Sequence, residues 1–300
     1  MTLRYLFALF RTPNRVNRHF LHMGRGIERR ASKMAAYWDP HLQQSKLAQQ
    51  RWAGVATGRE VAILGAGQLM DVDLDALAKS YQTLWLIDAD PISVTTWRNL
   101  RVPVRWDLAD VSGVQKTWTL NMERTTGSWQ KFLHAIGDLP CPADCCFAAE
   151  ADGVISLNLL SQIPVVWQDI LEEILNSRFG HDFVAKREQQ WLMAFAPKAR
   201  WLVEQHLAML ASSGANNVLI ITDLEYGHYA DLIANAAYMS ALYGVNLESD
   251  RSALLPGYSL DWKELWDWHI SPLGFESKKQ GTVHKVGAFA FKRNQPADPV

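Results

Sequence analysis

Val61-Ala62-Ile63-Leu64-Gly65-Ala66-Gly67 is the stretch that decides the fold, because an uninterrupted apolar run ends there in a Gly-x-Gly turn. Continuous apolar residues are typical of a strand buried on both faces of a parallel sheet. The two glycines let the backbone turn tightly and approach a ligand where a Cβ atom would clash. The stretch therefore predicts the first strand and turn of a nucleotide-binding βαβ unit.

The residues after the turn complete this unit. Apolar side chains recur at helical spacing and predict an amphipathic helix: Leu74, Leu77, Ala78 and Tyr81. A second apolar run, residues 84–87, ends at Asp88, 23 residues after Gly65. A carboxylate at that point can accept two hydrogen bonds from a ribose diol. A Gly-x-Gly turn alone is weak evidence, but strand, turn, helix, strand and acid in this order indicate an α/β fold with an adenosine-containing cofactor.

The side chains after Gly67 distinguish between two classes of cofactor. A dinucleotide fingerprint has a third glycine beneath the pyrophosphate, and this chain has Met70 there. Asp71 would also repel a pyrophosphate. A cofactor without phosphate and with a cationic amino-acid end suits the turn better, so we predict S-adenosylmethionine (SAM). An NAD-dependent oxidoreductase is the disfavoured alternative.

Further segments extend the alternation of strands and helices. Strands are predicted at residues 102–106, ending near Asp107, at 151–157, at 218–222 and at 284–291. A carboxylate after the third strand can accept from an adenine amino group. Four helices are predicted here: one that begins at Pro164, a second that ends at Ala196, a third from Pro197 to Ser212, and a fourth over residues 228–243.

Together these segments resemble the class I (Rossmann-like) SAM-dependent methyltransferase family over roughly residues 58–222, especially its poorly characterised bacterial members. The resemblance implies a seven-stranded, mostly parallel sheet with helices on both faces, an antiparallel last strand and an N-terminal helical extension. It implies methyl transfer to a small-molecule acceptor by in-line displacement. The cofactor-binding residues that it implies are Gly65, Ala66, Gly67, Asp71, Asp88, Ala89, Asp107, Leu108 and Asn158.

Two positions depart from the family pattern. Ile63 stands where the family often has an acid, and Leu69 stands where it has a third glycine. Asp71, on the other side of the turn, is the residue that could supply the absent carboxylate. The same departures support an alternative hypothesis, in which the chain is a non-catalytic, methyltransferase-like binding or scaffold protein.

The chain divides into an N-terminal helical extension, residues 1–57, and a methyltransferase domain, residues 58–300, with insertions at about 111–149 and 225–265. The extension is expected either to cover the cofactor cleft as a lid or to anchor itself on the domain. The expected substrate pocket comprises Tyr37, Trp38, His41, Gln162 and Tyr226. No catalytic residue is assigned, and the candidates for proton transfer are Glu225, His228, His269 and His284.

Composition limits the remaining possibilities. The 300 residues, 48% hydrophobic with a net charge of −1, are enough for one large α/β domain and do not suggest a nucleic-acid partner. Residues 1–33 are rich in arginine, which leaves peripheral membrane contact open, but their apolar run is too short to span a membrane. Cys141, Cys145 and Cys146 do not have the spacing of a metal site, so we expect reduced thiols, no metal and a cytoplasmic protein.

Overall fold

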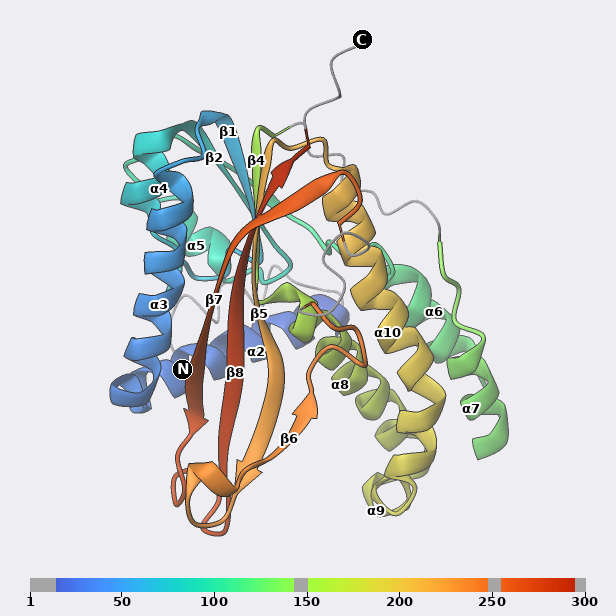
Figure 1. Cartoon of the computed structure of the whole chain (residues 1–300). Coiled ribbons are helices and arrows are strands. Elements are labelled where there is room, and N and C mark those ends of the chain that lie inside the picture. Colours follow the sequence, from blue (N-terminus) through green and yellow to red (C-terminus); the bar gives the residue numbers. More distant parts are fainter. Residues whose placement is uncertain (1–14, 143–150, 248–254, 295–300) are drawn as a thin grey trace.

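The structure, a computed structural model, describes residues 15–142, 151–247 and 255–294 (Figure 1). The helices are α2 (Arg15–Lys33), α3 (Ala35–Ala53), α4 (Leu74–Ser80), α5 (Ser93–Trp97), α6 (Gln115–Arg124), α7 (Trp129–Gly137), α8 (Leu159–Phe179), α9 (His181–Ala185) and α10 (Glu188–Ser212). The strands are β1 (Gly58–Leu64), β2 (Tyr81–Asp88), β3 (Val104–Leu108), β4 (Gly153–Leu157), β5 (Asn217–Tyr229), β6 (Ala237–Ser240), β7 (Tyr258–Ser271) and β8 (Gly281–Arg293).

One sheet organises the described residues, with the strand order β3-β2-β1-β4-β5-β8-β7. The first five strands pair in parallel, and β8 pairs antiparallel with both β5 and β7. This arrangement confirms the predicted α/β, Rossmann-like fold and its antiparallel last strand. The sheet has eight strands rather than seven, because the short β6 also pairs with β5.

Helices cover both faces of this sheet (Figure 1). On one face, α3 and α4 pack on a core that includes Ile63, Leu86 and Ile155. On the other face, α8 and α10 lie over a second core and continue into a helical cluster with α6 and α7. Because both faces are covered, the central parallel strands are apolar where they are buried, at residues 61–64 of β1 and throughout β4, whereas the edge strand β3 is largely exposed.

The antiparallel half of the sheet differs most from the sequence prediction. Strand β5 continues past the predicted end at residue 222 as far as Tyr229, and residues 228–243, predicted as a helix, hold the end of β5, a 3-10 turn (Ile233–Asn235) and β6. Residues 225–229 of β5 pair with β8 after a bulge between Asp223 and Glu225, and Tyr226 lies opposite His284. Long-range pairing therefore overrides the local helical pattern.

Two prolines also lie inside helices that they were expected to begin. Pro164 lies within α8, which already starts at Leu159, and Pro197 lies within the single long helix α10. A proline inside a helix removes one backbone hydrogen bond and is unfavourable by ~3 kcal/mol. In α10, buried side chains on both sides of the proline, Phe195 and Leu202 among them, pack in the same cluster and offset that loss.

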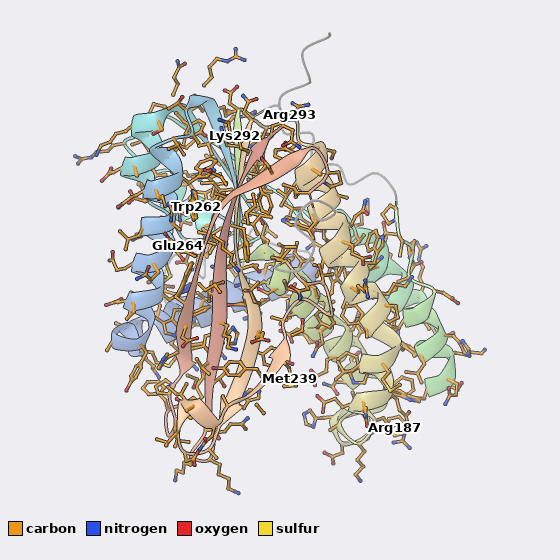
Figure 2. All side chains as sticks on the ribbon, in the orientation of Figure 1. Arg187, Met239, Trp262, Glu264, Lys292 and Arg293 are labelled. Atoms are coloured by element: carbon orange, nitrogen blue, oxygen red, sulfur yellow. The ribbon has the colours of Figure 1, made fainter. Side chains whose placement is uncertain are left out.

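The two N-terminal helices pack on the domain. Helix α3 lies along β7, where Arg51 forms an ion pair with Glu264 at 2.6 Å and lies 4.3 Å from the ring centre of Trp262 (Figure 2). Helix α2 runs on toward α8, where His19 Nδ1 lies 3.2 Å from Glu173 Oε1. Among the described helices, none has the length and apolarity needed to cross a bilayer.

Candidate functional site

The candidate site lies at the carboxyl ends of β1 and β4, where the strand order reverses direction. In open α/β sheets the loops leaving two such strands diverge, and this leaves a crevice in which ligands bind. The Gly65–Gly67 turn follows β1 and Asn158 follows β4. Asp88 ends the neighbouring β2. The topology therefore brings together residues that lie far apart in the sequence.

The backbone of the turn has an unusual conformation at three positions. Gly65, Gly67 and Leu69 have φ angles of 77°, 46° and 64°, in the left-handed region. A Cβ atom on Gly65 would clash with the carbonyl oxygen of Leu157 and lie 2.8 Å from the Leu159 side chain. A Cβ atom on Gly67 would meet nothing closer than Asp88 Oδ2, at 3.8 Å. Gly65 is thus required for packing, whereas Gly67 borders open space.

Asp88 is fixed by the backbone of its own site. Its Oδ2 accepts from the Gly67 N–H at 2.8 Å, and its Oδ1 accepts from the Asp90 N–H at 2.7 Å. Burial raises the pKa of Asp88, although these backbone hydrogen bonds oppose the rise. A carboxylate has about four acceptor positions, and the backbone N–H groups of Asp90, Gly67 and Ala89 leave about one of them for a ligand.

Asp71 belongs to the same site and is held from two sides. The amide of Asn158 donates to its Oδ2 at 2.9 Å, and the buried side chain of Gln49, on α3, donates to its backbone oxygen at 2.6 Å. Burial raises the pKa of Asp71 to about 6, and the nearby Asp88 charge adds to that rise. Asn158 Oδ1 is buried and has no hydrogen-bond partner. The pair therefore presents an acidic carboxyl group beside an unused acceptor.

Asp90 is a buried acid that sequence reasoning missed. It accepts from the Ile92 N–H at 2.9 Å, and it lies directly against Gly24 of α2, where no side chain would fit. The backbone oxygen of Gly24 accepts from Gln68 in the turn at 3.1 Å. Burial, followed by the charge of Asp88, raises the pKa of Asp90 to about 8. The Asp-x-Asp spacing at the end of β2 was the signal that could have found it.

The residues expected to hold adenine lie on the outermost strand of the parallel half. Asp107 and Leu108 are exposed in β3, and Asp107 lies inside the strand rather than after it. Its Oδ2 accepts from Trp85 Nε1 at 2.7 Å. Ala89 follows Asp88 and is half-buried. Leu108 pairs with Asp88 in the sheet, which places the end of β3 next to the end of β2.

Three of the expected substrate-pocket residues come from the N-terminal extension, and their surroundings differ. Trp38 donates to the backbone oxygen of Ile270, and the His41 ring stacks on Trp268 with 4.0 Å between ring centres. Both side chains are buried, whereas Tyr37 is exposed. Burial lowers the pKa of His41 to about 4, so its ring is neutral at pH 7. Trp38 and His41 attach α3 to β7.

A second polar group extends from Asn158 along the antiparallel strands. Ser161, in the first turn of α8, donates its hydroxyl hydrogen to Asp223 Oδ2 at 3.0 Å. Asp223 Oδ1 lies 3.2 Å from His284 Nδ1. Burial disfavours the Asp223 carboxylate, but the adjacent His284 and His41 outweigh burial and lower its pKa. Ser161 and Asp223 were missed, although Asp223 directly follows the predicted fifth strand.

The other proton-transfer candidates lie apart from Asp223. Glu225 forms an ion pair with Lys285 at 2.7 Å, and both side chains are more than 40% exposed. His228 Nδ1 lies 3.2 Å from Thr282 Oγ1, and its ring contacts Tyr226. His269 is half-buried on β7, and Gln162 is half-buried in the first turn of α8. Of the four candidates, His284 is the one in contact with a buried acid.

Five tryptophans of the two expected insertions and their flanks lie in two places. Trp118 and Trp129 belong to the helical cluster, whereas Trp262, Trp266 and Trp268 face α3 on the other side of the sheet. Cys141 is exposed, with Lys198 Nζ at 3.4 Å from its sulfur, and Cys145 and Cys146 lie outside the described residues. Within the described ranges, no group of three or more His, Cys, Asp and Glu side chains could hold a metal ion.

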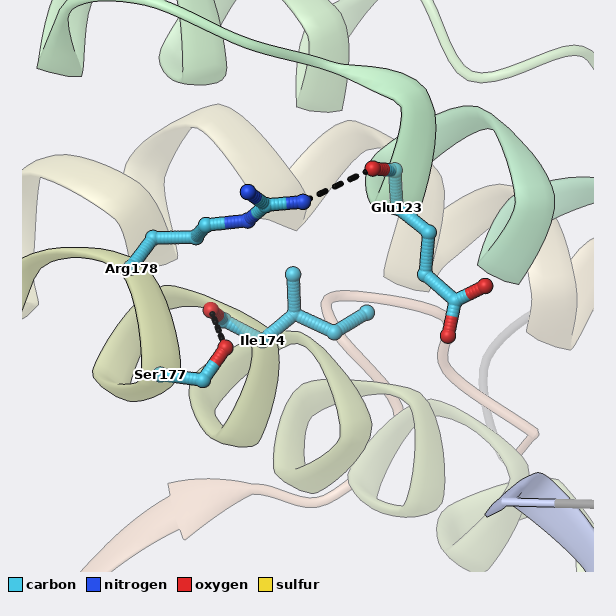
Figure 3. A pocket seen from close by; sticks show the side chains of 4 residues that line it. All are labelled: Glu123, Ile174, Ser177 and Arg178. Carbon is cyan, nitrogen blue, oxygen red and sulfur yellow. Dashed lines mark hydrogen bonds between the residues drawn. The ribbon is translucent and has the colours of Figure 1, made fainter.

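A hollow of about 340 Å³ lies on the helical side of the molecule, away from these residues. Glu123, Ile174, Ser177 and Arg178 line it, and Arg178 closes one side by donating to the backbone oxygen of Glu123 at 2.9 Å (Figure 3). Figure 3 shows the Glu123 carboxylate pointing away from Arg178. The hollow brings together no acid–base pair and is not part of the candidate site.

Comparisons with known proteins give distant structural similarity only. No family model matches the chain, and no curated protein matches its sequence. A TehB-like SAM-dependent methyltransferase from Corynebacterium glutamicum is 14% identical, with 91% of this chain and 99% of that chain covered and a TM-score of 0.39. A 1,6-didemethyltoxoflavin N1-methyltransferase from Burkholderia thailandensis, solved with that compound and S-adenosylhomocysteine, is 11% identical over 90% and 89%, with a TM-score of 0.36.

A third solved structure, from Pyrococcus horikoshii, is provisionally described as an RNA methyltransferase. It is 14% identical, with 84% of this chain and 85% of that chain covered and a TM-score of 0.40. At these identities and scores the similarity assigns no reaction, so the function must be inferred from the site.

Proposed function

We propose that the chain is a SAM-dependent methyltransferase that transfers a methyl group to a small-molecule acceptor. The observation that carries this proposal is the acidic cluster around the glycine turn, Asp71, Asp88 and Asp90. Burial raises the pKa of all three, and the Asp88 charge adds to the rise at Asp71 and Asp90. Such a cluster favours a cationic ligand and repels a pyrophosphate, because opposite charge stabilises the ionised carboxylates and like charge does not.

The residues present fit the amino-acid end of SAM. Asp71 offers a carboxylate and Asn158 offers the unpartnered Oδ1, and both are hydrogen-bond acceptors suited to an ammonium group. The position of Asp71 after the turn supports the inference that it replaces the acid absent at Ile63. Gly67, with open space where a side chain would lie, leaves room for the ligand beside these acceptors.

The residues also fit the adenosine end. Asp88 retains an acceptor position for a ribose hydroxyl, with Ala89 beside it. Asp107 Oδ1 is the oxygen not used by Trp85 and is the proposed acceptor for the adenine amino group, next to Leu108. Gly65 and Ala66 set the path of the turn along the cofactor, because their backbone N–H groups donate to the backbone oxygen of Ile87.

When bound, SAM supplies a methyl group on a cationic sulfur. The protein then needs to align the acceptor with that methyl group and to exclude water, and alignment alone can lower the barrier by roughly 7–11 kcal/mol. Helices α2 and α3 cover this part of the domain, and they favour an acceptor small enough to be enclosed. The net charge of −1 and the acidic cluster also disfavour a phosphodiester backbone. These features support a small-molecule acceptor.

Calorimetric titration of the full chain with SAM and, separately, with NAD⁺ tests the proposal. We expect saturable binding of SAM and none of NAD⁺. Asp88→Asn should weaken SAM binding at least about tenfold, or ~1.4 kcal/mol. Asp75→Asn is the matched control, because Asp75 is an exposed acid on α4. Absence of SAM binding at millimolar concentration by the folded protein would contradict the proposal.

A further inference from the structure

A histidine and an acid meet on the antiparallel strands where the parallel sheet ends. Asp223, on β5, is 4% exposed, and the His284 side chain, on β8, retains 18% exposure. The Asp223 carboxylate faces His284 Nδ1 at 3.2 Å, whereas its other oxygen accepts from Ser161. An ionised carboxylate at Nδ1 favours the tautomer that carries its proton there. Nε2, on the opposite side of the ring, is then left as an unprotonated acceptor.

The contact between Asp223 and His284 is close but not aligned as a hydrogen bond, since neither Asp223 Oδ1 nor His284 Nδ1 has a hydrogen-bond partner in the described structure. In unliganded sites such bonds are often poorly aligned and become shorter when a substrate binds. The 3.2 Å separation is already within hydrogen-bonding distance.

Two aromatic side chains lie close to this histidine. The ring centres of Trp268 and Tyr226 lie 5.8 and 6.1 Å from that of His284. Trp268 Nε1 is buried and has no acceptor, although a buried indole N–H usually finds one. The two aromatic rings beside the imidazole favour a planar aromatic ligand.

A series of short contacts connects this place with the proposed cofactor site. Asn158 donates to Asp71 at 2.9 Å, and its backbone oxygen lies 3.5 Å from the Ser161 hydroxyl oxygen. Ser161 donates to Asp223 at 3.0 Å, and Asp223 meets His284 at 3.2 Å. His284 is therefore connected with the residues proposed for the methionine end of SAM through Asp223 and Ser161.

The side chains around His284 come from β5, α3, β7 and its own strand β8. Strand β5 contributes Asp223, Tyr226 and His228, and α3 contributes His41, which burial keeps neutral at pH 7. Strand β7 contributes the uncharged Trp268. Lys285, the next residue on β8, pairs with Glu225. Asp223 is the acid in direct contact with His284, and its lowered pKa keeps it ionised.

We propose that His284 is the general base of the methyl transfer, that Asp223 is its positioning residue, and that the acceptor is a planar aromatic molecule with an acidic O–H or N–H. The proposal rests on the proposed methyltransferase function. The acceptor atom gives its proton to His284 Nε2 and uses its electron pair to bond to the methyl carbon. The carbon–sulfur bond breaks, its electrons stay on sulfur, and the sulfonium becomes a neutral thioether. Protonated His284 afterwards releases the proton to water.

The tautomer of His284 is the first test, measured by long-range ¹H–¹⁵N NMR on the full chain at pH 7.5. We expect the Nδ1–H form in the native protein and a shift toward the Nε2–H form in Asp223→Asn, which keeps the shape of the side chain. An Nε2–H tautomer in the native protein overturns the assignment of His284 as a base.

The second test uses 4-nitrophenol as the acceptor probe on protein saturated with S-adenosylhomocysteine. The coloured phenolate reports proton transfer without turnover. We expect the native protein to lower the apparent pKa of the bound phenol, so that about tenfold more phenolate forms at a fixed pH. His284→Gln should abolish this gain while its melting temperature and S-adenosylhomocysteine affinity stay unchanged. His181→Gln, an exposed histidine with 77% side-chain exposure, is the matched control.

The outcomes separate the two proposals. If S-adenosylhomocysteine binds but 4-nitrophenol does not, or if His284→Gln yields as much phenolate as the native protein, the general-base proposal is wrong and the methyltransferase proposal stands. If the native protein binds neither S-adenosylhomocysteine nor SAM, both proposals are wrong.

Discussion

Alanine substitutions at the two glycines of the turn should separate packing from ligand binding. Gly67 has a φ angle of 46°, and a left-handed conformation is unfavourable by about 1–2 kcal/mol for an L-residue with a side chain. Because a Cβ atom there contacts nothing closer than 3.8 Å, we expect Gly67→Ala to lower the free energy of unfolding by only that ~1–2 kcal/mol. Its methyl group, however, would lie in the space proposed for SAM.

Gly65→Ala adds a clash to the same backbone strain. Its Cβ atom would overlap the Leu157 carbonyl of β4 and approach Leu159 to 2.8 Å. Overpacking of this kind destabilises by ~1–3 kcal/mol, so with the backbone strain the expected total is ~2–5 kcal/mol. Gly257→Ala is the control for strain alone, since Gly257 has a φ of 85° with open space around it and lies at the other end of the sheet.

Urea denaturation and calorimetric titration with SAM measure the two effects. We expect Gly67→Ala to remain folded and to lose at least tenfold in SAM affinity, and Gly257→Ala to lose stability without losing affinity. Full SAM affinity in Gly67→Ala, or a loss of stability as large as that of Gly65→Ala, would refute the reasoning.

Three further results are expected. SAM affinity should rise about tenfold from pH 5 to pH 7 in titrations, because the pKa of Asp71 is about 6 and its ionised form binds the ammonium group; Asp71→Asn should remove this dependence, and a persistent slope would contradict it. Asp90→Asn should stabilise the fold by more than ~1 kcal/mol at pH 8 and hardly at pH 4 in urea denaturation. The reason is that ionising Asp90 in the folded protein, where its pKa is about 8, destabilises the fold; this destabilisation begins near pH 4 and is complete above pH 8. Equal effects at both pH values, or the same effect in the exposed control Asp182→Asn, would disprove it. Asn158→Ala should have a lower melting temperature than Asn158→Gly, with a free energy of unfolding smaller by ~1–2 kcal/mol. Both variants lose the Asp71 hydrogen bond, but only alanine is strained at a φ of 55°, so equal melting temperatures would argue against that strain.

The sequence predicted the parallel half of the fold because its signals are local. The apolar run of β1, the positive φ angles of Gly65 and Gly67, and Asp88 at the end of β2 all lie within one stretch of the chain. The central strands β1 and β4 are buried on both faces, so their apolar pattern is continuous and easy to recognise.

The antiparallel half was harder to predict because long-range pairing determines it. Residues 223–229 include several polar side chains and no continuous apolar run. They form a strand because β8, more than fifty residues later, pairs with them. The contact between Asp223 and His284 depends on that pairing, and nothing near either residue in the sequence indicates it. The uninterrupted α10 likewise depends on packing across Pro197, which local propensity cannot reveal.

The most direct test of the central claim is a crystal structure of the full chain with S-adenosylhomocysteine. We expect the ligand at the Gly65–Gly67 turn, with a ribose hydroxyl on Asp88 and its ammonium group between Asp71 and Asn158 Oδ1. A ligand bound elsewhere on the chain, or one at the turn whose ammonium group contacts neither Asp71 nor Asn158, would contradict the claim.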